Sequence, residues 1–131
     1  MIGALLLGCL GLLPPAVAAG AESVALAIVN EGQAPLRCQL LLAHWMSESL
    51  APLAPGAETR LTLGRDAAGQ LFLERAGEAR PFHLEALVCG ADLGTARRHL
   101  DLSALRRGEA AGLVARCDPA DEPPCRTEAH P

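Results

Sequence analysis

The feature that most constrains the fold of this chain is a series of short apolar segments separated by residues that favour turns. The segments lie at residues 24–30, 36–45, 59–63, 71–76, 82–89 and 111–117. The stretches between them, such as NEGQAP at 30–35 and GRDAAGQ at 64–70, contain the glycine, proline, asparagine and aspartate that turns require. Short strands repeated in this way predict an all-β sandwich or barrel.

Two further segments complete the predicted domain organisation. DLSALRRG at 101–108 predicts one short helix, with Asp101 or Ser103 as its cap and Gly108 at its end. The last segment, 118–131, holds four prolines and few apolar residues, so we expect an irregular, proline-rich tail. The predicted sandwich domain therefore covers residues 22–117.

The first 21 residues contain no charged side chain and end in small residues. This pattern predicts a signal peptide that is cleaved after Ala18 or Ala21, which places the mature protein in the periplasm or outside the cell. One alternative is an uncleaved anchor, because about 20 apolar residues are enough to span a bilayer. Another is a lipoprotein, since LLGC at 6–9 matches a lipidation box with Cys9 as the modified residue.

Four cysteines remain after this segment, namely Cys38, Cys89, Cys117 and Cys125. An even number of cysteines in a small exported domain predicts a disulfide framework, for which three connectivities exist. Metal sites use closely spaced pairs such as CxxC, and the sequence has none. We therefore expect disulfides and no metal.

The sequence offers no catalytic or cofactor motif. In a single strand, Cys38 and His44 would lie roughly 20 Å apart, too far for a nucleophile and its base. His44, His83, His99 and His130 lack the spacing of metal ligands, and neither GxSxG nor a phosphate-binding loop occurs. The net charge of −4, with eleven arginines and no lysine, lacks the basic excess that is typical of nucleic-acid-binding proteins. We predict that the protein is not an enzyme and binds no cofactor.

The first half of the chain carries a pattern of turn residues between strands, formed by Asn30, Gly32, Ala34, Pro35, Leu53, Pro55, Gly56, Leu61 and Leu63. This pattern resembles the bacterial extracytoplasmic immunoglobulin-like domains of the cell-adhesion-related type. The whole chain also resembles uncharacterised small secreted proteins of Gram-negative bacteria. The resemblance implies an immunoglobulin-like antiparallel β-sandwich.

The immunoglobulin arrangement also implies a pairing of the cysteines. It bridges two strands across the core, which favours Cys38–Cys89 and leaves Cys117–Cys125 to close the tail. However, strict alternation puts Cys89 on the opposite face from Phe82 and Leu84. A β-bulge would correct the phase; without one, Cys89 would pair with Cys117 or Cys125.

Two regions are candidates for contact with a partner. One is the proline-rich loop 50–58, and the other is the basic segment 96–107 with Arg97, Arg98, Arg106 and Arg107. The basic segment has a second interpretation as a solvated surface, because Asp92, Asp101 and Glu109 lie nearby in the sequence.

We predict a non-enzymatic accessory or binding module that acts through protein–protein contacts in the cell envelope, with an envelope or secreted protein as its partner. The alternative is a membrane-anchored accessory subunit of an envelope complex, in which the four arginines would face lipid. A third class is a metal-binding or redox protein.

Overall fold

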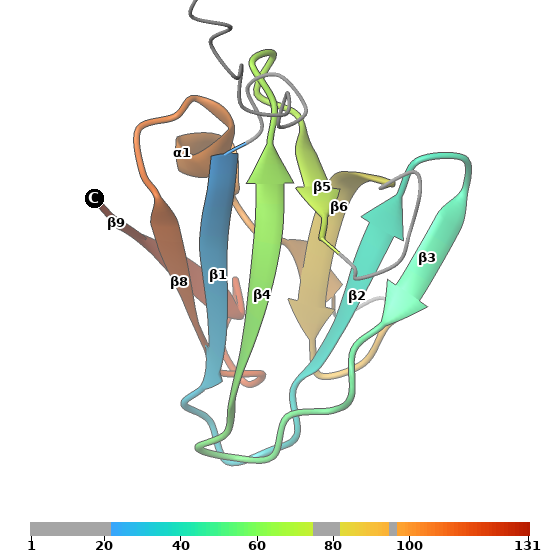
Figure 1. Ribbon diagram of the computed structural model, residues 1–131. Coiled ribbons are helices and arrows are strands. Elements are labelled where there is room, and N and C mark those ends of the chain that lie inside the picture. The colour runs from blue at the N-terminus through green and yellow to red at the C-terminus, as the bar shows by residue number, and fades with distance from the viewer. Residues whose placement is uncertain (1–21, 75–81, 95–96) are drawn as a thin grey trace, which may run out of the picture.

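The computed structural model describes residues 22–74, 82–94 and 97–131 and has an all-β fold with one short helix, as predicted (Figure 1). The elements are β1 (Glu22–Asn30), β2 (Arg37–Leu42), β3 (Met46–Ser49), β4 (Glu58–Arg65), β5 (Leu71–Leu73), β6 (His83–Gly90), β7 (Arg97–His99), α1 (Ser103–Arg106), β8 (Gly112–Cys117) and β9 (Cys125–His130).

The strands join edge to edge in the order β3-β2-β6-β5-β4-β1-β8-β9, and β7 pairs with β6. This continuous sheet folds over to make a sandwich-like body. In Figure 1, β8, β1 and β4 form one side, and β6, β2 and β3 form the other. The short strand β5 connects the two sides, since it pairs with both β4 and β6. All strand pairs are antiparallel except β1–β8, which is parallel.

The core lies between the two sides, and the alternation of side chains along each strand explains its composition. In β1, the inward side chains Val24, Leu26 and Ile28 are buried, whereas Ala25 on the outer face is exposed. In β2, the buried side chains are Cys38, Leu40 and Leu42. Leucines from β4, β5, β6, α1 and β8 complete one apolar cluster, and Phe82 packs against it while partly buried. Among the described residues, no fully buried member of this cluster is aromatic.

The strands predicted at 24–30, 59–63, 82–89 and 111–117 correspond to β1, β4, β6 and β8. The single strand predicted at 36–45 is wrong, because β2 ends at Leu42 and the chain turns back into β3. The strand predicted at 71–76 ends at Leu73, and residues 75 and 76 lie outside the described part of the chain.

The prediction of an irregular tail over residues 118–131 is wrong for its second half. Residues 125–130 form β9, which pairs with β8 along its full length and extends the sheet. The domain therefore continues past Cys117. Backbone pairing and the Cys117–Cys125 disulfide hold this polar strand, which has little apolar surface to bury. The predicted boundary at residue 21 falls outside the described residues, which begin at Glu22.

Both cysteine pairs favoured by the immunoglobulin resemblance are present, Cys38–Cys89 and Cys117–Cys125. The resemblance implied a bridge across the core, and this part is wrong, because Cys38–Cys89 joins β2 and β6, which are neighbours in the same sheet. Each joins residues that face one another across an antiparallel pair of strands. A β-bulge in β6 corrects the phase of Cys89: Leu41 pairs with Ala86 and Leu42 with Leu84, so Glu85 is the extra residue. Leu84, Leu87 and Cys89 consequently all face the core.

The short helix α1 lies at the end of the body near β8 (Figure 1). The Asp101 carboxylate accepts hydrogen bonds from the Ser103 hydroxyl (2.6 Å) and the Ser103 amide (3.0 Å), and these bonds hold the pKa of Asp101 below its usual value. Past the other end, Gly108 adopts a φ of +72°, which favours glycine. The nearly buried Arg65 donates to the Leu105 carbonyl (2.8 Å) and pairs with Glu22.

We expect the two disulfides to contribute unequally to stability. The Cys38–Cys89 bridge closes a 51-residue separation and the Cys117–Cys125 bridge an 8-residue one, which correspond to about 4 and about 2.5 kcal/mol of reduced chain entropy. Unfolding by urea should therefore show a larger loss for the C38A/C89A variant than for C117A/C125A. An equal or reversed loss would contradict this assignment.

Candidate contact surfaces

The loop 50–58 is fastened to the body by Asn30, a fully buried polar residue at the end of β1. The Asn30 side-chain amide donates to the carbonyls of Ala34 and Leu53 (both 2.9 Å), and its oxygen accepts from the Gly32 amide (3.0 Å). The Asn30 backbone also bonds Gly56 and Ala57. These bonds link the 31–35 turn to the loop, so the loop is a supported element of the fold.

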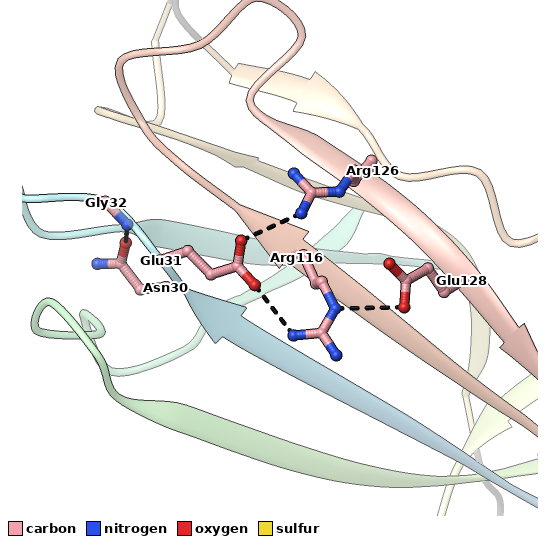
Figure 2. Close-up of polar contacts among 6 residues, drawn as sticks. All are labelled: Asn30, Glu31, Gly32, Arg116, Arg126 and Glu128. Atoms are coloured by element: carbon pink, nitrogen blue, oxygen red, sulfur yellow. Dashed lines mark hydrogen bonds and ion pairs between the residues drawn. The ribbon is translucent and has the colours of Figure 1, made fainter.

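A network of charged side chains lies on β8, β9 and the residue that follows β1. Figure 2 shows Glu31 between Arg116 (3.0 Å) and Arg126 (3.3 Å), while Arg116 also contacts Glu128 (3.2 Å). Hydrogen bonds from Arg116 to Glu31, and then to Glu128, raise the pKa of the Arg116 guanidinium. These pairs are exposed, so each adds little stability, but together they give β9 a charged outer surface.

The four arginines predicted as a contact patch lie in two separate places. Arg97 and Arg98 are on β7, opposite Gly90 and Cys89 at the end of β6. Arg97 donates to the Gln39 side chain (3.0 Å), and Arg98 forms an ion pair with Glu122 (3.0 Å) in the β8–β9 loop.

Arg106 and Arg107 lie near the other end of β6. Arg106 donates to the carbonyls of Leu84 (3.2 Å) and Glu85 (3.0 Å), and so binds backbone oxygens at the β6 bulge. Arg107 pairs with Glu109 (2.7 Å), an interaction that lowers the pKa of Glu109. All four arginines therefore have partners within the protein, and their contact with another molecule stays a prediction.

A shallow depression of about 320 Å³ lies on the outer face of β4, β1, β8 and β9. Its small apolar side chains are flanked by polar ones, and it is lined in part by Ala25, Ala27, Glu58, Arg60, Gly112, Val114 and His130. Arg60 and Glu58 pair with each other at 3.0 Å.

The turn between β2 and β3 has an unusual backbone. Residues 43–45 form it, and the register that pairs Leu42 with Met46 fixes this three-residue length. His44 (φ +64°) and Trp45 (φ +62°) both adopt the left-handed conformation, which glycine or asparagine normally occupies. Two bulky residues in succession cost free energy here, and such strain concentrates at functional sites.

Trp45, the only tryptophan of the chain, is fully exposed at this turn, with a relative exposure of 103%. Met46 beside it is 45% exposed, and within the described ranges these are the large apolar side chains that face solvent. A buried tryptophan side chain removes roughly 150–250 Å² of surface from water, so its burial is among the largest contributions that one side chain makes to the stability of a core. The fold gives up that contribution at Trp45.

The sequence did not reveal this site. Neither His44 nor Trp45 is a turn-forming residue, so the apolar run 36–45 was predicted as one strand, with Trp45 either over the end of the core or at a surface. The chain in fact reverses at these residues, and the tip of the hairpin points away from the core. A weak signal was available, because MSES at 46–49 is too polar to continue a buried strand.

The described residues contain no group of three or more His, Cys, Asp or Glu side chains placed to hold a metal ion. The four histidines lie apart, in the β2–β3 turn and on β6, β7 and β9, and the His83 ring packs edge-on against Phe72 at 4.4 Å between centroids. Within the same residues, no helix has the length and apolar character needed to cross a bilayer.

No protein-family model, curated protein or solved structure gives a significant match to this chain. The immunoglobulin-like resemblance therefore stays a prediction.

We expect the strain of the turn and the side chain of Trp45 to be separable by mutation. Trp45→Ala removes only exposed surface and should change the free energy of unfolding by less than about 0.5 kcal/mol. Trp45→Gly also relieves the left-handed backbone and should be more stable than Trp45→Ala by about 1 kcal/mol. Denaturant unfolding measures both, and a large loss in Trp45→Ala would mean that the indole packs against the body.

Proposed function

We propose that this protein is a non-enzymatic exported binding module that contacts a partner protein of the cell envelope through its β2–β3 hairpin. The observation that carries the proposal is Trp45, a fully exposed aromatic at a turn whose backbone does not suit it. Tryptophan is the residue type most enriched at the energetic centres of protein interfaces. An exposed tryptophan on a strained turn lowers stability and is best explained by a contact that it makes.

The construction of the hairpin supports this proposal. The turn is held at its first residue by the Ala43 amide, which donates to the His83 carbonyl (2.9 Å), and β2 is bonded covalently to β6 through Cys38–Cys89. A side chain on such a supported element loses less conformational entropy on binding than one on a long loop. The disulfides are consistent with an oxidising compartment outside the cytoplasm, as the apolar first 21 residues predict.

The proposal is tested by site-specific photocrosslinking in the native host. A benzophenone-bearing aromatic residue replaces Trp45 in one variant and Arg60 in a control, because Arg60 is also highly exposed but lies on β4. We expect position 45 to yield a discrete protein adduct that position 60 does not give. Equal adducts at both positions, or adducts with lipid alone at position 45, would contradict the proposal.

A further inference from the structure

We infer that the partner binds as an extended strand that adds to β3 and lengthens the sheet. This inference rests on the proposed function and specifies its recognition mode. Strand addition combines backbone hydrogen bonds, which supply affinity, with side-chain contacts at alternate positions, which supply specificity. The β2–β3 hairpin offers both, because β3 is a terminal strand of the sheet and Trp45 and Met46 stand at its start.

The backbone of β3 has hydrogen-bonding groups directed away from β2. Residues of an antiparallel pair alternate between those that bond across the pair and those that do not. The Leu50 amide donates to the Cys38 carbonyl (3.0 Å), so Glu48 and Met46 also direct their backbone groups toward β2. The amides and carbonyls of Ser47 and Ser49 consequently point to the open side, where no described strand pairs with them.

The two ends of the sheet differ in how well they are protected. At the β9 end, Arg126 and Glu128 belong to the charged network of Figure 2, and charged edge strands resist further pairing. In β3, the sequence MSES has one charged residue, Glu48, and no lysine, arginine or proline, and the β3–β2 ladder has no bulge. Figure 1 shows β3 at the outer edge of its side of the body. Of the two edges, β3 carries fewer charged side chains and is therefore the better suited to accept a strand.

The chemistry of the edge selects a polypeptide over a lipid surface. A bilayer could receive Trp45 and Met46, but it would leave the Ser47 and Ser49 amides and carbonyls without partners in hydrocarbon. An extended peptide satisfies these groups and can place an apolar side chain against the indole. We therefore expect a partner segment with apolar residues at alternate positions.

A second copy of this chain fits the edge poorly. The register that uses both Ser47 and Ser49 of each copy is centred on Glu48, and it sets the two Glu48 carboxylates directly opposite each other. Like charges in that position destabilise a strand pair. The inference is therefore restricted to a different polypeptide.

The test begins with a phage-displayed library of random dodecapeptides selected on the full disulfide-bonded protein. We expect enriched peptides with alternating apolar residues. Amide hydrogen exchange by NMR then locates the bound peptide. The Ser47 and Ser49 amides should exchange quickly in the free protein, more quickly than Glu48, and become protected when the peptide binds. Failure to enrich any peptide, or exchange at both serines that stays fast with peptide bound, would overturn the inference.

A matched pair of variants isolates the backbone contribution. Ser49→Pro removes one outward amide at an edge position where proline is tolerated, whereas Ser49→Ala keeps that amide. Fluorescence anisotropy should show about tenfold weaker peptide binding for Ser49→Pro and unchanged binding for Ser49→Ala. Equal binding by the two variants would overturn the inference. If Ser49→Pro does not fold, the test uses wild-type protein and a peptide that is N-methylated at alternate residues, which lacks the amides needed to pair with β3. This peptide should bind more weakly than the unmethylated peptide.

The same experiments separate this inference from the proposed function. Peptide binding that depends on Trp45 but not on the Ser49 amide would refute strand addition and leave the hairpin as the contact site. Peptide binding that depends on neither would refute both. Binding of the protein to phosphatidylglycerol vesicles, with no peptide enriched, would assign the hairpin to a membrane surface and also refute both.

Discussion

The Cys38–Cys89 disulfide joins facing residues of β2 and β6 and, together with the ladder between these strands, holds the β2–β3 hairpin in position. β3 pairs only with β2 among the described strands, so β3 follows wherever β2 is held. The bulge at Glu85 makes this bridge possible, because it turns Leu84 and Cys89 toward the same core. A covalent bond inside an Ala- and Leu-rich body therefore supports the part of the surface that carries Trp45.

Where this small sheet turns or bulges, side chains form hydrogen bonds with backbone groups that strand pairing leaves unbonded. Asn30 binds the turn that follows β1 and the loop that follows β3, Arg65 binds the carbonyl at the end of α1, and Arg106 binds two carbonyls at the β6 bulge. A guanidinium suits this task because its five donors can reach several carbonyls at once. In a chain without lysine, arginines thus serve the fold at positions that the sequence suggested for partner contact.

The parts of the fold that could be predicted from sequence are those with clear periodicity or clear turn residues. β1 and β4 alternate apolar and small or polar residues and are separated from their neighbours by glycine and proline. Their predicted bounds were therefore close to the bounds in the structure. β3, β7 and β9 are short and polar, and backbone pairing holds them in place, so local pattern could not find them. The disulfide pairing came from a resemblance, since four cysteines alone allow three connectivities. The turn at His44 and Trp45 contradicts local preference, and for that reason it escaped prediction and also marks the candidate site.

The central claim is that the core closes without Trp45 and leaves its indole free for a partner. Because Trp45 is the only tryptophan, the fluorescence of the purified native protein reports on this one side chain. We expect the emission maximum of a fully hydrated indole, and quenching by acrylamide as efficient in the native protein as in the unfolded chain. Blue-shifted emission that is shielded from acrylamide in the native monomer would show that Trp45 is buried, and would contradict the account.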